Sequence, residues 1–342
     1  MVSILSFVLI IAVCVVIHEY GHYRTAIAMG IQVHEFAFGM GPVIFSKKGK
    51  RNIWSVRLFP IGGFVRLAGM EEEESQEVSC PGMGFNEKSP WARLSVLIAG
   101  PASNVFLAFL LTALLLGGQG VLNMETPTVG SIMAGYPSDL AGIRPGDVII
   151  SVNGESVSDW SSMAQAIRNS PLDDPLALII LREGREINMN VEITDDPVTG
   201  FPLLGIQPGR IRYSPLKAIN QSMSYTFHMS TAMIKGIGEW IFGKTEVDVS
   251  GPIGIASMAG DAAKQGLWPF ISFLAIISLN LGIINLFPFP ALDGGRIIFI
   301  LGEIVTGKRL SQAIEGYIHF AGFVLLIGLI LFITWQDVMK LL

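Results

Sequence analysis

The chain contains four long apolar runs that could cross a membrane, and the segments between them could not. They cover approximately residues 1–23, 94–117, 267–288 and 316–336. Each is long enough to span about 30 Å of hydrocarbon as a helix. The first run lacks the basic region and the small-residue cleavage site of a signal peptide, so we expect it to be retained. The pattern predicts a polytopic α-helical membrane protein with about four transmembrane helices.

Between the second and third runs, short apolar stretches alternate with glycine turns. Over residues 121–195 this alternating pattern predicts strands and a short helix, with a longer helix at Trp160–Ser170. Leu216–Trp240 then has apolar residues at helical spacing. This amphipathic helix could lie on the outer membrane face or pack against protein, because its polar face is poor in Lys and Arg.

A shorter alternating pattern follows the first apolar run. Ile53–Leu58 and Phe64–Leu67 alternate like strands on either side of an Ile61–Gly63 turn, which predicts a β-hairpin with an available edge over about 53–67. Such an edge could receive an extended peptide by strand addition. A surface hairpin on the cytoplasmic side is the alternative. The acidic run Glu71–Glu74 indicates a solvated loop.

Composition supports a mixed membrane protein. Of 342 residues, 51% are hydrophobic and 15% are charged, which is too apolar for an ordinary soluble enzyme. The net charge of −5 and the absence of a Lys/Arg cluster argue against a nucleic-acid partner. Cys14 lies in an apolar run and Cys80 in a polar stretch, so neither a disulfide framework nor a thiolate zinc site is expected.

Charge also predicts the orientation in the membrane. Lys and Arg are frequent in the loop 24–93, and Arg296, Lys308 and Arg309 follow the third run. The positive-inside rule places both loops in the cytoplasm. Residues 118–266 and both termini would then be extracytoplasmic, in a bacterial cytoplasmic (inner) membrane.

The first apolar run carries the sequence His18-Glu19-Tyr20-Gly21-His22 near its end. Residues four apart share one face of a helix, so His18 and His22 could bind one Zn²⁺ while Glu19 acts as general base. A bare HExxH motif also occurs by chance, and isolated histidines are often ordinary core residues. At membrane depth, however, an ionisable cluster indicates a functional site.

A second motif begins near the end of the third apolar run. It reads Asn285-Leu286-Phe287-Pro288-Phe289-Pro290-Ala291-Leu292-Asp293-Gly294-Gly295. Its prolines and glycines predict a broken helix, and a break at membrane depth must be surrounded by protein or line a water-filled cavity. Asp293 could complete a His₂Asp zinc site with one open position. The alternative is a solvated Asp in a helix-capping turn. Asn285 could bind the substrate backbone or cap the broken helix.

These two motifs together resemble the site-2 protease family of intramembrane zinc metalloproteases. Within the family the chain is similar to the bacterial RseP type, the regulator of sigma-E protease. Other family-like stretches are FGMGP at 38–42, PIGGFVR at 60–66, GPASN at 100–104 and GPIGI at 251–255. The AGIRPGDVI and VNG sequences within 141–154 resemble a circularly permuted bacterial PDZ domain. This chain has room for a single PDZ domain, whereas the enterobacterial member has two.

The resemblance implies a role for each candidate residue. His18, His22 and Asp293 would bind Zn²⁺, Glu19 would be the catalytic base, and Asn285 would contact the substrate. The family's membrane-re-entrant β-loop would correspond to the predicted hairpin, with these substrate-binding candidates: Val56, Arg57, Leu58, Gly63, Phe64 and Val65. Asn104 is interpreted as structural. The PDZ domain could bind a new carboxyl terminus at residues 200–206, or it could exclude substrates with bulky outer domains.

The predicted organisation has four parts. Residues 1–117 would hold the first two transmembrane helices and the β-loop, 118–210 the PDZ domain, 211–266 an amphipathic connecting segment, and 267–342 the last two transmembrane helices. The predicted function is regulated intramembrane proteolysis of single-span proteins in the lipid bilayer. Expected substrates resemble anti-sigma factors already trimmed outside, or signal-peptide remnants. A transporter or metal-binding scaffold, and an inactive PDZ adaptor, are the competing functions.

Overall fold

The computed structural model describes residues 1–49, 52–70, 80–172, 174–195, 200–244 and 250–341. The chain divides into two compact units, of which the first comprises Met1–Leu115 with Ile219–Leu342 and the second comprises Leu116–Ala218. We call them the membrane unit and the inserted unit and describe each by itself. The acidic run expected at 71–74 lies outside the described residues.

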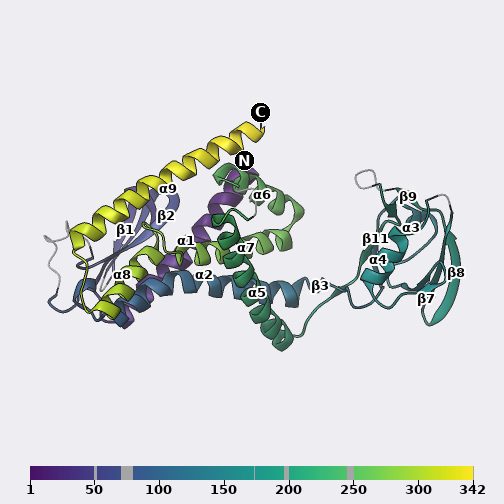
Figure 1. Ribbon diagram of the computed structural model, residues 1–342, viewed down its shortest axis with the longest axis horizontal. Helices are drawn as coiled ribbons and strands as arrows, with labels where there is room; N and C mark the ends of the chain where they lie inside the picture. Colours follow the sequence, from purple (N-terminus) through teal and green to yellow (C-terminus); the bar gives the residue numbers. More distant parts are fainter. Residues whose placement is uncertain (50–51, 71–79, 173, 196–199, 245–249, 342) are drawn as a thin grey trace. The chain divides into compact units, whose positions relative to one another are not determined.

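The secondary-structure elements follow the chain in this order (Figure 1): α1 (Val2–Ala28), β1 (Val33–Lys48), β2 (Ile53–Leu67), the 3-10 helix η2 (Phe85–Glu87), α2 (Pro90–Gly118), β3 (Val121–Leu122), β4 (Val129–Ile132), α3 (Pro137–Leu140), β5 (Val148–Val152), β6 (Glu155–Ser156), α4 (Trp160–Arg168), β7 (Leu176–Arg182), β8 (Arg185–Val191), β9 (Thr194–Asp195), β10 (Pro202–Leu203), β11 (Ile206–Pro208), β12 (Arg210–Ile211), α5 (Pro215–Ile241), α6 (Pro252–Gln265), α7 (Leu267–Asn285), α8 (Asp293–Thr306) and α9 (Gln312–Leu341).

Four helices of the described chain are long and apolar enough to cross a membrane, namely α1, α2, α7 and α9. Their outward side chains include many exposed large apolar residues, as expected for surfaces that contact lipid. The third helix ends at Asn285, three residues before the predicted end, because the proline-containing segment that follows does not continue it. The predicted class of polytopic α-helical protein with an inserted α+β unit is confirmed.

Helices α1 and α2 approach each other closely where α1 carries Gly21. A Cβ atom at this position would lie 2.3 Å from the carbonyl oxygen of Ala99 on α2. Small residues permit such backbone contact between helices in lipid. The contact lies one residue before His22, so it determines how close the motif on α1 comes to α2.

A β-hairpin is present, as predicted, but it is formed by β1 and β2. The chain reverses between Lys48 and Ile53, where the N–H of Gly49 donates to the carbonyl of Asn52. The expected turn at Ile61–Gly63 does not close a hairpin. Alternation identified the strand character of 53–67 but not its partner, which depends on tertiary pairing.

Both strands are bent, so that β1 lies between two stretches of β2. Phe36 of β1 pairs with both Trp54 and Val65, and Val56 of β2 pairs with both Phe38 and Phe45. In the sheet formed by the described residues, the Gly63–Leu67 stretch pairs with a single stretch of β1, Val33–Phe38, and has no partner on its other side. This stretch therefore forms an edge, whereas Val56 is paired on both sides.

A buried carboxylate fixes the shape of this sheet. Glu35 is almost fully buried and accepts hydrogen bonds from Ser55 Oγ at 2.5 Å and Arg57 Nη2 at 2.8 Å. Burial opposes ionisation, but these hydrogen bonds and the charge of Arg66 nearby lower the pKa of Glu35 below its usual value. The guanidinium of Arg57 thus forms an ion pair with Glu35, and it also stacks over the ring of Phe64.

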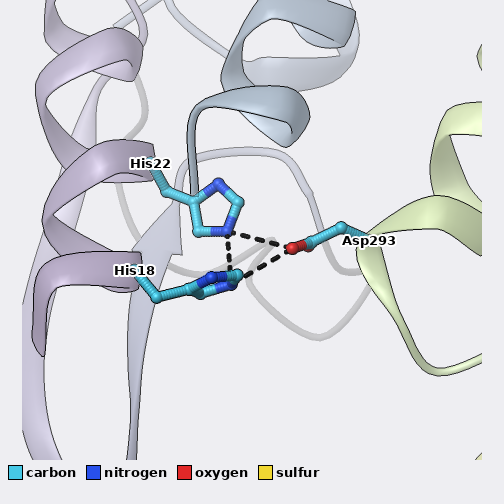
Figure 2. A group of neighbouring side chains, drawn as sticks. All are labelled: His18, His22 and Asp293. Carbon is cyan, nitrogen blue, oxygen red and sulfur yellow. Dashed lines mark hydrogen bonds and ion pairs between the residues drawn. The ribbon is translucent and has the colours of Figure 1, made fainter. Parts of the chain in front are cut away.

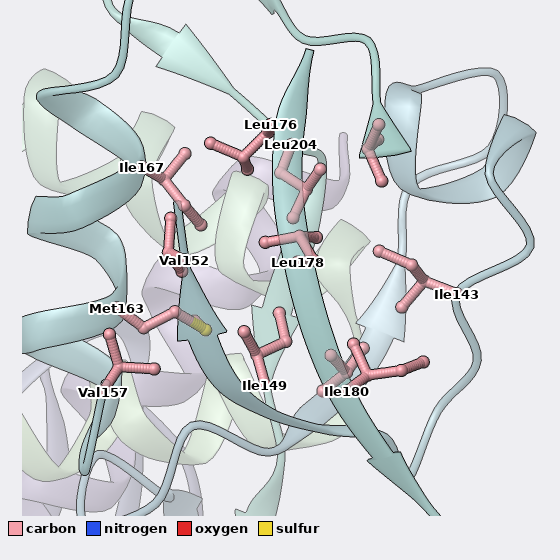
Figure 3. Packing of buried hydrophobic residues seen from close by; sticks show 12 residues of the cluster. Ile143, Ile149, Val152, Val157, Met163, Ile167, Leu176, Leu178, Ile180 and Leu204 are labelled. Carbon is pink, nitrogen blue, oxygen red and sulfur yellow. The ribbon is translucent and has the colours of Figure 1, made fainter. Parts of the chain in front are cut away.

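The inserted unit has its own hydrophobic core. Its main sheet has the strand order β6-β5-β7-β8, and α4 packs against it. Figure 3 shows the core, in which Ile149, Leu178 and Ile180 are among the fully buried side chains. The alternating burial along β7 is typical of a sheet with one face covered.

Helix α5 has two different surfaces along its length. Near its start the small residues Ala218, Ser222 and Thr226 are buried, while large apolar residues such as Phe227 are exposed. Further along, a set of apolar side chains packs against α2 and α7: Met229, Met233 and Ile237. The predicted helix is present, and its exposed apolar surface is suited to a lipid surface.

Candidate active site

Three potential metal ligands from distant parts of the sequence converge in the membrane unit (Figure 2). His18 and His22 come from α1, and Asp293 is the first residue of α8. The Nε2 atoms of the two histidines are 3.1 Å apart. Asp293 Oδ2 lies 3.1 Å from His18 Nε2 and 3.4 Å from His22 Nε2. The two sequence motifs thus meet at one point.

The helix explains the pairing of the histidines, and α2 orients the second of them. Residues 18 and 22 lie one turn apart, on the same face of α1. His22 Nδ1 is 2.8 Å from the carbonyl oxygen of Val96 on α2. Because a carbonyl only accepts, Nδ1 carries the proton, which leaves the lone pair of Nε2 available to a metal ion.

Asn104 on α2 lies beside the other histidine, although from the sequence alone it was interpreted as structural. It is fully buried, and its side-chain amide is 3.4 Å from His18 Nδ1. The atom that faces Nδ1 is the amide nitrogen, a donor, so Asn104 can orient the imidazole as the Val96 carbonyl orients His22 when the amide is turned to present its oxygen. The sequence signals were a polar residue within an apolar run and the family-like GPASN stretch at 100–104, neither of which indicates its contact.

The break between α7 and α8 positions Asp293. Helix α7 ends at Asn285, and residues 286–292 form turns before α8 begins. A Cβ atom at Gly294 would lie 2.1 Å from the carbonyl oxygen of Phe287. The glycine therefore allows the first turn of α8 to pack directly on the preceding loop. An acidic residue is favoured in this first turn by the helix dipole.

A cavity of about 380 Å³ opens beside the three ligands. Glu19 and Asn285 line it together with Gly63, Phe64 and Val65 from the free edge of β2. The carboxylate of Glu19 accepts a hydrogen bond from the backbone of Val65. The predicted candidates Val56, Arg57 and Leu58 belong to the other stretch of β2 and do not line this cavity.

The geometry of the donor atoms fits a zinc ion. Zinc binds His nitrogen and carboxylate oxygen at about 2.0–2.2 Å in tetrahedral sites, which separates neighbouring ligand atoms by about 3.4 Å. The three separations observed here are 3.1, 3.1 and 3.4 Å. Three protein ligands leave a fourth position, which is characteristic of catalytic rather than structural zinc.

Comparison with known proteins identifies the family of the chain. The family model for Peptidase family M50 matches residues 6–329. The chain belongs to peptidase family M50. It is 31% identical to zinc metalloprotease RasP of Geobacillus kaustophilus, over 99% of this chain and 98% of that protein. It is 27% identical to the regulator of sigma-W protease RasP of Bacillus subtilis, over 99% of both chains.

Family membership establishes this M50 protein as a zinc metalloprotease of the site-2 protease type. With four candidate membrane helices, the general function is intramembrane proteolysis. The transporter, scaffold and inactive-adaptor alternatives are therefore set aside. Among solved structures, the PDZ domain of an SdrC-like protein from Listeria monocytogenes aligns with 25% of this chain and 90% of its own length, at 16% identity and a TM-score of 0.22.

Proposed function

We propose that this M50 protease cleaves transmembrane segments of single-span membrane proteins, using His18, His22 and Asp293 to bind zinc and Glu19 as the general base. The observation that carries the proposal is the shared cavity. It joins the predicted ligands and base to an unpaired strand edge inside the membrane unit.

Each residue has a distinct chemical task. Bound zinc supplies activation of a water molecule and polarisation of the scissile carbonyl. Glu19, which lines the cavity beside the ligands, accepts the proton from that water and delivers it to the leaving amine. Asn285 lines the same cavity from the end of α7 and donates its amide N–H groups to the substrate backbone or the developing oxyanion.

The substrate must be extended before it can be cut, because the peptide bonds of a transmembrane helix are enclosed by their own hydrogen bonds. We propose that the extended segment adds to β2 at Gly63, Phe64 and Val65, which line the cavity. Val56 is paired on both sides and Arg57 binds Glu35, so we limit the proposed binding edge to residues 63–65.

The inserted unit is proposed to be an extracytoplasmic PDZ domain that selects substrates by size. We propose that the active site lies toward the cytoplasmic leaflet of a bacterial inner membrane, with both termini outside, because Lys and Arg are frequent in the loop 24–93. The name of the Bacillus subtilis relative, regulator of sigma-W protease, supports anti-sigma-factor-like substrates. Signal-peptide remnants are the second proposed class, because they too are short single-span segments.

The proposal is tested with purified protein in liposomes and two forms of one single-span substrate, with and without a folded outer domain. We expect the trimmed form to be cut at least about tenfold faster, which corresponds to about 1.4 kcal/mol in activation free energy. Mass spectrometry should place the cut within the apolar segment, and a zinc chelator should abolish it. Equal cleavage of both forms would contradict the size filter. A cut confined to the aqueous segments would contradict intramembrane proteolysis.

A further inference from the structure

The loop that precedes Asp293 contains a residue in an unfavourable backbone conformation. Ala291 has φ = +78°, in the left-handed region that non-glycine residues seldom adopt. Such a conformation is strained and persists only where the surroundings hold it. Ala291 lies two residues before Asp293, so whatever holds Ala291 also determines where the carboxylate of Asp293 points.

The group that holds Ala291 comes from a different helix. The N–H of Leu292 donates to Phe289 within the loop. The N–H of Ala291 instead donates to Nδ1 of His319 on α9, at 3.0 Å. An unpaired backbone N–H is strongly unfavourable inside a membrane, where no water replaces the missing acceptor. His319 therefore stabilises this conformation of the loop.

Helix α9 also contacts the loop one turn beyond His319. A Cβ atom at Gly322 would lie 2.3 Å from Cβ of Pro290 and 2.6 Å from its carbonyl oxygen. Residues three apart share a helix face, so His319 and Gly322 together form one contact surface for Pro290 and Ala291. The ring of His319 packs edge-on against Phe299 of α8, which fixes its orientation.

Helix α9 is anchored at its other end as well, so this contact surface has a defined position. Asp337 accepts hydrogen bonds from the N–H groups of Gly251 and Gly254, at 3.1 and 2.9 Å. A carboxylate at this place caps the start of α6, where its charge is favoured. The GPIGI sequence at 251–255 thus provides the backbone groups that bind α9 to α6.

We propose that His319 is a positioning residue that holds the Asp293 carboxylate in place for zinc binding, through its hydrogen bond to Ala291. The inference rests on the proposed role of Asp293 as a zinc ligand. Because the N–H of Ala291 is a donor, Nδ1 of His319 must be unprotonated and act as the acceptor. Partners outside the ligand shell commonly change metal affinity or activity by about 10–100-fold.

The test compares two amide substitutions that differ only in where they place the acceptor. In His319→Asn the amide oxygen falls near the position of Nδ1 and can accept from Ala291. In His319→Gln the amide falls near Nε2 and cannot. Zinc affinity is measured by chelator competition on purified protein, together with the visible spectrum of the cobalt-substituted form, which reports the ligand geometry. We expect about 10–100-fold weaker zinc binding in His319→Gln and a value close to wild type in His319→Asn.

Equal losses in both variants would show a packing role and overturn the proposal, as would unchanged zinc binding in both. Should His319→Gln not be recovered in folded form, His319→Ala also lacks the acceptor and carries the same expectation. Asp293→Asn is the reference variant. If it binds zinc like wild type, the proposed ligand set is wrong. If it loses zinc while His319→Gln does not, only the positioning role is wrong.

Discussion

Replacing Glu19 with Gln is expected to leave zinc bound and to reduce the cleavage rate by about 10²–10⁴-fold, the usual contribution of a general base. Gln has nearly the same size as Glu and can still accept a hydrogen bond from the backbone of Val65. It cannot take a proton from water at neutral pH. The three proposed ligands are other residues, so metal binding should persist.

The measurement pairs zinc content with the cleavage rate of a single-span substrate in liposomes. Asp293→Asn is the matched comparison, because it alters a proposed ligand rather than the base. Zinc retained without cleavage in Glu19→Gln, and zinc lost in Asp293→Asn, would separate the two roles. Cleavage by Glu19→Gln at the wild-type rate would exclude Glu19 as the base.

Replacing Gly100 with Ala is expected to weaken zinc binding by at least about 100-fold, the upper end of what changes around a ligand shell usually cost. Gly100 lies on α2 beside the imidazole of His22. A Cβ atom there would be 2.2 Å from Nε2 and 2.5 Å from Cε1 of that ring. The ring cannot move away freely, because its Nδ1 is bound to the Val96 carbonyl.

The effect of Gly100→Ala should be confined to the metal site. Ala is a better helix former than Gly by about 1 kcal/mol, so α2 itself is not weakened. Gly117→Ala on the same helix is the control, since a Cβ atom there would have its nearest neighbours at 3.8 and 3.9 Å. Zinc titration of both proteins checks the expectation. Wild-type affinity in Gly100→Ala would show that α2 does not approach His22 as closely as the structure indicates.

The sequence predicted those parts of the site that depend on local geometry. Helical periodicity brings His18 and His22 together. The prolines and glycines around Asp293 indicate a broken helix. Which helix packs against these residues is a tertiary property, so the contacts of Gly100, Asn104 and His319 could not be predicted.

The β-hairpin shows the same limit. Alternation over residues 53–67 correctly indicated extended chain, but a strand's register and partner depend on a second segment. The β1 strand, with two glycines and many apolar residues, shows no comparably clear alternation. The predicted turn was consequently misplaced, and Val56 was grouped with Gly63 although the structure pairs Val56 on both sides.

We propose that zinc in this M50 protease is bound by two histidines and one carboxylate within the membrane unit. Zinc K-edge X-ray absorption on the purified wild-type protein tests it most directly. We expect two imidazole ligands and oxygen ligands at about 2.0–2.2 Å, without sulfur. In Asp293→Asn this signal should be lost or change in its oxygen ligands. A sulfur ligand at about 2.3 Å, or a spectrum unchanged by Asp293→Asn, would contradict the account.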